Sequence, residues 1–150
     1  MDNILLDCEK GVKICDFGVS KIIKKGQVIQ EQCGTPAYLA PEIIIDKGYE
    51  GFFVDVWSLG VLLFAMLCGT VPFKAPSLEE LHKLILKGEF TFPEHLSKEA
   101  HDLVKSMIKL DPAQRATLPQ VLSHPWLKET NELESDTEEE DEEGDEEQKS

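Results

Sequence analysis

Basic residues are scarce in this chain. Its 150 residues include 15 Lys and Arg against 29 Asp and Glu, a formal net charge of -14. The imbalance lies at the end, because residues 129–150 hold 13 acidic residues and one Lys, whereas residues 1–128 hold 16 acidic and 14 basic residues. A nearly neutral body is thus followed by an acidic tail. We expect no nucleic-acid partner, since proteins that bind nucleic acids present a basic surface.

Long apolar runs and frequent cysteines are also lacking. The most apolar stretch, Val54 to Cys68, is about 15 residues long, whereas a membrane span needs about 20 apolar residues. Its apolar residues fall on every side of a helix, so we predict a central helix surrounded by protein, and no membrane partner. The four cysteines and the absence of a signal peptide predict reduced thiols in an intracellular location, cytoplasmic or nuclear.

The body reads as mainly helical. Two short strands, Ile4–Leu6 and Val12–Cys15, are predicted to form a hairpin, and an aperiodic stretch with several Gly and Pro follows from Phe17 to Gly51. After the central helix, three further helices are predicted to open at the N-cap residues Ser77, Ser97 and Thr117. The expected architecture is mainly α with one small β-hairpin at its start, over residues 1–128, and a disordered acidic tail over 129–150.

Two oxygen-bearing side chains bracket the predicted hairpin. Asn3 precedes the first strand and Asp16 follows the second, and antiparallel strands of similar length bring their outer ends together. An amide oxygen and a carboxylate suit Mg²⁺, which takes few protein ligands and keeps water or phosphate oxygens for the rest. The alternative is that both residues merely cap strand ends.

A series of motifs follows this pair in a fixed order. Asp16-Phe17-Gly18 lies 13 residues after Asn3, and Glu42 lies 26 residues after Asp16; next come Asp55-Val56-Trp57-Ser58-Leu59-Gly60 and Asp111-Pro112-Ala113-Gln114-Arg115. In this order and spacing, residues 2–128 resemble the C-terminal lobe of protein kinases. The resemblance implies phosphoryl transfer from ATP, with Mg²⁺, to the hydroxyl groups of a protein substrate.

The resemblance also implies roles around the predicted hairpin. Asn3 and Asp16 match the residues that hold Mg²⁺ on the ATP phosphates, and Leu5 matches an apolar residue under the adenine ring. Phe17 matches part of the switch between active and inactive forms. Gly18 is expected to supply backbone freedom beside it.

Further along, Gly34 to Glu42 resembles the substrate-positioning end of the activation segment. Thr35 matches a residue that contacts the catalytic machinery, and the surrounding pattern favours Ser and Thr over Tyr as acceptors. Glu42 and Arg115 match a buried ion pair that anchors this segment. Asp55 is expected at the N-terminus of the central helix, where it would accept backbone N–H bonds and brace the catalytic loop; a simple N-cap is the alternative.

Glu31 stands where many kinases carry a phosphorylatable Thr, two residues before Cys33. A fixed carboxylate does part of the work of a phosphate in ordering such a segment. Phosphorylase kinase and some relatives have Glu at the matching place. We therefore hypothesise that loop phosphorylation is not required here, against the alternative of an ordinary exposed Glu, and place the resemblance nearest to the calcium/calmodulin-dependent-like, phosphorylase-kinase-like branch.

The first motif that this chain matches lies after the catalytic Asp in the order of kinase motifs. The catalytic Asp would lie five residues before Asn3, ahead of Met1, and the Gly-rich loop, the strand Lys and its Glu partner belong further upstream. We thus expect a fragment, inactive alone, whose partner is the N-terminal lobe of the same polypeptide. The rival interpretation is a non-catalytic binding or scaffold module that presents the acidic tail.

The tail contains two candidate modification sites. Ser135 and Thr137 each have Glu three positions further on, as in sites of acidophilic casein kinases. The alternatives are a solubilising, self-repelling segment and a segment that binds a basic partner.

Overall fold

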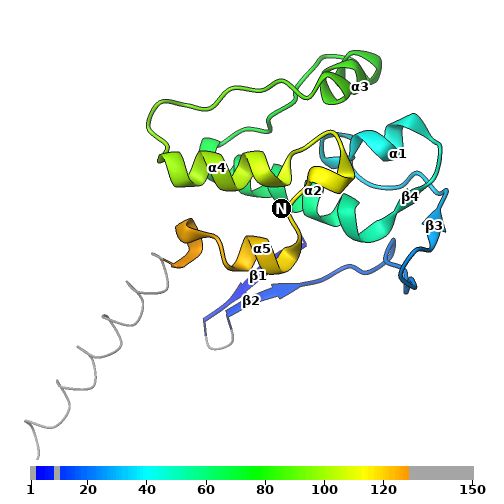
Figure 1. The fold of residues 1–150 in the computed structure, drawn as a ribbon, viewed down its shortest axis with the longest axis horizontal. Coiled ribbons are helices and arrows are strands. Elements are labelled where there is room, and N and C mark those ends of the chain that lie inside the picture. The colour runs from blue at the N-terminus through cyan, green and yellow to red at the C-terminus, as the bar shows by residue number, and fades with distance from the viewer. Residues whose placement is uncertain (1–2, 9–10, 129–150) are drawn as a thin grey trace, which may run out of the picture.

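The computed structural model of the chain describes residues 3–8 and 11–128 (Figure 1). The described part is mostly helical, as predicted. The predicted acidic tail, with Ser135 and Thr137, lies outside the described residues. In chain order the elements are β1 Ile4–Asp7, β2 Gly11–Ile14, β3 Val28–Ile29, a 3-10 helix Pro36–Tyr38, α1 Pro41–Ile45, β4 Tyr49–Glu50, α2 Gly51–Cys68, α3 Leu78–Lys87, α4 Lys98–Met107, a second 3-10 helix Pro112–Gln114 and α5 Leu118–Leu122.

Two small antiparallel sheets flank the helices. The predicted hairpin is confirmed: β1 pairs with β2, with Ile4 opposite Ile14. The prediction of only one hairpin was wrong, because β3 pairs with β4, placing Ile29 opposite Tyr49. Strands of two residues carry no alternation for a pattern search to detect, so this second sheet was hidden inside the aperiodic stretch.

The predicted central helix is α2, which starts at Gly51, earlier than expected. Glu50 is its N-cap, and Gly69 ends it in the left-handed region at φ 69°, with its N–H bonded to the Ala65 carbonyl. One alternative and one expectation therefore fail. The alternative of a simple N-cap at Asp55 is excluded, since Asp55 lies inside the helix. The helix is also not covered on every side by the described residues, because Met66 is 63% exposed.

By length and apolar composition alone, α2 is long enough to cross a membrane. Its 18 residues have a mean hydropathy of 2.0, and 44% of them are buried inside the protein. The central helix of a folded domain has the same properties. This is the position of α2, which lies beside α4 within the helical body (Figure 1).

The core forms where α2 meets the later helices. Ser77 and Ser97 cap α3 and α4 as predicted, since their Oγ atoms accept N–H bonds from Glu80 at 3.3 Å and Ala100 at 3.1 Å. α4 packs closely on α2 because Gly60 has no side chain: a Cβ there would lie 2.8 Å from the Met107 Cβ. The largest fully buried side chains are Trp57, Phe73, Ile85, Leu103, Met107, Val61 and Val104.

Candidate functional site

The open end of the hairpin carries Asn3 and Asp16. The Cys15 N–H donates to the Asn3 carbonyl at 2.9 Å, so the pairing continues one step beyond β1 and β2. Asp16 is the next residue, and it adopts a left-handed φ of 61°. Because this conformation is outside the strand region, it ends the regular alternation of side chains at Asp16. Asn3 and Asp16 are both exposed there.

Asp16 turns the chain through its own carboxylate. Its Oδ1 accepts the Gly18 N–H at 3.2 Å, a local turn that Asp side chains favour. The left-handed residue is thus Asp16, whereas Gly18 has no positive φ, contrary to the expectation of special backbone freedom there. Gly18 is instead short of space, because a Cβ would lie 3.1 Å from Asp16 Oδ1. Phe17 and Leu5 are 67% and 52% exposed.

The donor set at this end fits a hard cation. Within residues 3–8 and 11–128 no group of three or more His, Cys, Asp and Glu side chains is arranged to hold a metal ion. Mg²⁺ does not need such a group, since one or two oxygen ligands from the protein suffice when phosphate oxygens complete the shell. An amide oxygen at Asn3 and a carboxylate at Asp16 meet that requirement. Their joint ligation of Mg²⁺ stays a prediction.

A recess of about 370 Å³ opens between the segment after Asp16 and the start of α2. Thr35 in this recess is the N-cap of the first 3-10 helix, and its side chain makes no capping hydrogen bond. Among the many residues that line the recess are these predicted site residues: Asp16, Phe17, Glu31, Thr35 and Asp55. The fold thus gathers half of the predicted set around one hollow.

Asp55 contributes a carboxylate to that recess. Desolvation there raises the pKa of the Asp55 carboxyl above its ordinary value of 3.8. Among the described residues no N–H donates to this carboxylate, so the expected bracing bonds are not seen. The neighbouring Ser58 instead ties the two elements together, because its Oγ donates to the Tyr38 carbonyl at 2.9 Å. The sequence motif did not single out Ser58 for this bond.

The structure brings Glu42 and Arg115 together across 73 positions of sequence. Two parallel bonds join them, from Arg115 NH1 to Glu42 Oε1 at 2.7 Å and from NH2 to Oε2 at 3.1 Å. The Arg115 side chain is 0% exposed and that of Glu42 12%. Two-point pairing of this kind fixes orientation as well as charge.

Arg115 also satisfies backbone carbonyls at the same point. NH1 donates to the Phe53 carbonyl at 2.6 Å, while Nε and NH2 donate to that of Lys109 at 3.2 and 2.9 Å. Its guanidinium lies 5.2 Å from the centre of the Trp57 ring. One side chain therefore fastens α1, the start of α2 and the chain after α4.

Glu31 lies in a segment that several contacts hold in place. Lys21 Nζ donates to the Glu31 carboxylate, and Tyr49 Oη donates to the Glu31 carbonyl at 2.7 Å. The adjacent Gln32 donates to the Ile43 carbonyl at 2.8 Å. Sequence reasoning missed all three donors, because their partners lie 10 to 18 positions away and no spacing pattern marks them.

Burial and nearby acidic groups affect the pKa of Tyr49 itself. Desolvation raises the pKa of the Tyr49 hydroxyl above its ordinary 10.0, and the nearby Cys33, Glu31 and Asp55 raise it further. Tyr49 therefore stays protonated and keeps its proton for the bond to the Glu31 carbonyl.

Comparison with known proteins decides the family. The protein kinase domain family matches residues 1–127 of this chain. The chain belongs to the protein kinase family. It is 42% identical over 132 residues to the probable serine/threonine-protein kinase MARK-A of Dictyostelium discoideum, a match that covers 88% of this chain and 12% of that protein. These findings confirm the predicted membership of the serine/threonine protein kinases.

Two further relatives are also named as serine/threonine protein kinases. The chain is 44% identical over 127 residues to the serine/threonine protein kinase OSK3 of Oryza sativa subsp. japonica, covering 85% of this chain and 25% of the relative. It is 39% identical over 127 residues to the serine/threonine-protein kinase SIK2 of Gallus gallus, covering 85% and 16%. The chain therefore spans a quarter or less of these relatives. Their names do not single out the calcium/calmodulin-dependent-like branch.

Proposed function

We propose that this kinase segment supplies the C-terminal-lobe part of an enzyme that transfers phosphate from ATP to Ser and Thr of protein substrates. The observation that carries the proposal is the shared recess, which collects Asp16, Phe17 and Thr35 beside the segment that Glu42 and Arg115 fasten. Phosphoryl transfer depends mainly on positioning and charge stabilisation, so a rigidly anchored segment next to the metal-binding end is what the reaction needs.

Each residue has a defined part in that reaction. Asn3 and Asp16 would hold Mg²⁺ at the open end of the hairpin, where Mg²⁺ neutralises charge on the ATP phosphates when bound. The exposed Leu5 side chain is available to pack under the adenine ring. Thr35, the N-cap of the first 3-10 helix, would contact the catalytic machinery when the acceptor is Ser or Thr.

We also propose that phosphate transfer requires an N-terminal lobe. The 150 residues contain no Gly-rich phosphate loop and no His-Arg-Asp loop. Both are parts of the kinase reaction. The isolated chain is expected to bind ATP and Mg²⁺ very weakly and to transfer no phosphate at a useful rate.

A chimera separates the enzyme from the scaffold alternative. Residues 3–127 of this chain would replace the matched segment of the rice kinase, whose remaining sequence supplies the other lobe. We expect transfer of labelled phosphate from ATP to Ser and Thr peptides and none to the corresponding Tyr peptides. Asp16→Asn in the chimera should reduce the rate by about 10³-fold or more, since it weakens the metal site.

The control is Asp46→Asn, which changes an exposed carboxylate outside the proposed machinery and should leave the rate unchanged. A chimera that unfolds cooperatively and binds ATP yet transfers no phosphate would favour the scaffold alternative. Equal rates for the parent chimera and Asp16→Asn would remove Asp16 from the mechanism.

We propose a second role for Glu31, as a permanent substitute for loop phosphorylation. Its carboxylate pairs with Lys21 across the segment, and its carbonyl accepts the Tyr49 hydroxyl. A phosphate at this position would order the segment through the same kind of charge-assisted bond. The partner within the described residues is a Lys of the segment itself, rather than an Arg of the catalytic loop.

The test uses the same chimera without prior phosphorylation. Glu31→Ala and Lys21→Ala should each lower turnover, and Glu31→Asp should retain part of it. The matched control is Glu79→Ala, which removes an exposed carboxylate paired with Lys83 on α3. Unchanged turnover for Glu31→Ala would reduce Glu31 to an ordinary surface residue.

Two finer assignments complete the proposal. We place the kinase in the calcium/calmodulin-dependent-like branch, because the segment around Glu31 is similar to that of phosphorylase kinase. We place it inside the cell, in the cytoplasm or nucleus, which the four free thiols of Cys8, Cys15, Cys33 and Cys68 support. A fluorescent fusion of the full-length protein tests the location.

A further inference from the structure

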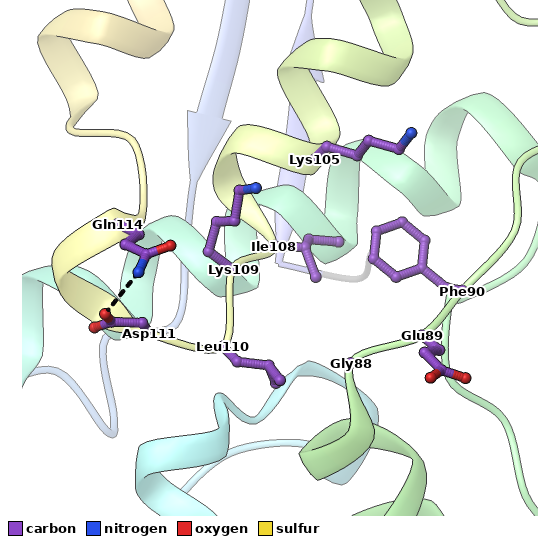
Figure 2. Close-up of a pocket in the computed structure, with 9 residues that line it drawn as sticks. All are labelled: Gly88, Glu89, Phe90, Lys105, Ile108, Lys109, Leu110, Asp111 and Gln114. Carbon is purple, nitrogen blue, oxygen red and sulfur yellow. Dashed lines mark hydrogen bonds between the residues drawn. The ribbon is translucent and has the colours of Figure 1, made fainter.

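A second hollow lies away from the recess, between the end of α3 and the end of α4 (Figure 2). It has a volume of about 490 Å³, within the range of ligand-binding sites. Phe90, Ile108 and Leu110 supply its apolar walls, and Lys105 and Lys109 project beside them (Figure 2). We call this hollow the lysine groove.

The charged side chains of the lysine groove differ in whether they have a partner of opposite charge or a hydrogen-bond donor. Its two carboxylates already have partners: Glu89 pairs with Lys87 at 2.8 Å, and Asp111 accepts bonds from Ala113 and Gln114 at 3.0 and 3.1 Å. The two ammonium groups differ, because neither Lys105 nor Lys109 pairs with a carboxylate anywhere in residues 3–8 and 11–128. Lys105 Nζ lies over an aromatic face, 5.6 Å from the centre of the Phe92 ring. Two exposed cations beside apolar walls fit an anionic segment.

The chain itself carries an anionic segment, which follows Lys128 in the sequence. Trp126 and Leu127 pack against a cluster that includes Leu103 and Met107 of α4, so the chain leaves the described body beside the helix that carries Lys105. Residues 129–150 follow, with 13 acidic residues and one Lys. The run 138–143 is entirely acidic and begins ten residues after Lys128, a span that reaches up to roughly 33–36 Å. The ten residues of α4 extend only about 15 Å.

We infer that the acidic tail of this chain, residues 129–150, docks on its own lysine groove, with carboxylates of the 138–143 run on Lys105 and Lys109. The inference is independent of the proposed catalytic function. A single exposed Lys–carboxylate pair is weak. The tail, however, offers many carboxylates to two fixed cations, and the tether holds them at an effective concentration in the millimolar range.

Zero-length cross-linking of the full chain tests this contact. A carbodiimide joins a lysine amine to a carboxylate only when the two touch, and mass spectrometry of the digest identifies the pair. At about 0.01 M salt, tail cross-links at Lys105 and Lys109 should exceed those at Lys74 and Lys98, which are also exposed, by about fivefold or more. About 1 M salt should remove the excess.

A mixture of ¹⁴N and ¹⁵N chains shows which copy supplies the tail. Cross-links within one isotope support docking of a chain's own tail, whereas mixed-isotope links would overturn it in favour of a second copy. The proposal would also be overturned if the tail cross-links were spread evenly over all four lysines. The same holds if the excess of cross-links at Lys105 and Lys109 persisted at high salt.

A second measurement does not depend on lysine chemistry. Replacing the acidic residues 138–143 of the full chain by Gln and Asn should shift the backbone NMR signals of residues 88–90 and 105–111. Signals around Lys74 serve as the control and should not move. Unchanged signals at the lysine groove would contradict the docking, whatever the cross-links show.

Discussion

The helical core and the N-terminal hairpin differ sharply in how the chain covers them. Trp57, Val61 and Val104 in the core are 0% exposed. In the hairpin Leu6 is 85% exposed and Val12 65%, and Ile22 in the segment after it is fully exposed. The core thus buries its apolar surface by itself, whereas the region that carries Asn3 and Asp16 leaves large apolar side chains in solvent. An apolar surface of this kind is typical of an interaction face.

The contrast separates stability from chemistry in this kinase segment. The residues that match the metal and nucleotide sites are exposed and lie on short elements, while the anchoring residue Arg115 is buried and fully bonded. Substitutions in the core should therefore lower stability strongly. Substitutions on the hairpin face should change association or function and leave stability nearly unchanged.

Arg115 offers the strongest test of this comparison. Arg115→Ala removes the Arg115 bonds to the Glu42 carboxylate and to the Phe53 and Lys109 carbonyls. Loss of one partner of a buried ion pair should lower the free energy of unfolding by about 3–5 kcal/mol. Urea unfolding followed by Trp fluorescence measures the change. Arg115→Lys keeps the charge but not the two-point geometry, and should fall between wild type and Arg115→Ala.

Replacing both partners sharpens the result. Each single variant leaves one buried charge unpaired, whereas Glu42→Gln combined with Arg115→Met leaves none. The double variant should therefore lose less stability than the sum of the single variants. An Arg115→Ala variant within about 0.5 kcal/mol of wild type would mean that the anchor has no structural weight.

Gly60 tests the close approach of α2 and α4. Gly60→Ala places a Cβ 2.8 Å from the Met107 Cβ and 2.9 Å from Ile108 Cγ1. Overpacking of this size should cost about 1–3 kcal/mol of unfolding free energy, although Ala is the better helix former. Met66→Ala on the same helix is the control, because Met66 is 63% exposed and should change stability by less than about 0.5 kcal/mol. A more stable Gly60→Ala would show that the helices can separate without loss.

The features that the sequence predicts are those with a local physical signature. Ser77 and Ser97 mark helix starts, because an N-cap acts over three residues. The hairpin was also readable from its two apolar runs. The β3–β4 pairing and the bonds of Lys21, Gln32 and Tyr49 were not, since they join short segments far apart in sequence.

The candidate site shows the same division. Family resemblance matched Glu42 to Arg115, a pairing that no local pattern contains. The same resemblance was wrong about the backbone at Gly18, where the left-handed residue is Asp16, and the N–H bonds that it implied for Asp55 are not seen among the described residues. The motifs thus predicted a side-chain pairing correctly and a backbone conformation incorrectly.

Tyr49 is half-buried, intermediate in exposure between the core and the hairpin, so its effect on stability should also be intermediate. Tyr49→Phe removes the donor to the Glu31 carbonyl at 2.7 Å and keeps the ring. The loss should lower the free energy of unfolding by about 0.5–1.5 kcal/mol and increase hydrogen exchange in residues 28–32. Tyr38→Phe is the matched control, and its exchange in 28–32 should stay at the wild-type rate. Unaltered exchange in Tyr49→Phe would show that β3–β4 pairing alone holds the segment.

Asp55 gives a smaller effect with a defined pH dependence. Its pKa is raised in the folded state by desolvation, so the folded protein binds this proton more tightly than the unfolded chain does. The ionised carboxylate therefore disfavours folding above the raised pKa, and the penalty fades as pH falls toward the ordinary 3.8. Asp55→Asn should be more stable than wild type at pH 7, and the difference should vanish at about pH 3.5 in thermal unfolding. A constant difference across this range would assign the effect to packing.

Leu6 and Val12 lie opposite each other on the exposed hairpin, where we expect almost no contribution to stability. Leu6→Thr with Val12→Thr keeps residues that suit a strand while removing apolar surface, so the free energy of unfolding should change by less than about 0.5 kcal/mol. Self-association, measured by sedimentation velocity, should decrease. Leu122→Gln on α5 removes a single apolar residue of 72% exposure elsewhere and should leave self-association as it is. If the hairpin variant lost several kcal/mol, the hairpin would belong to the folding core, and the division between a self-sufficient body and an open interaction face would fail.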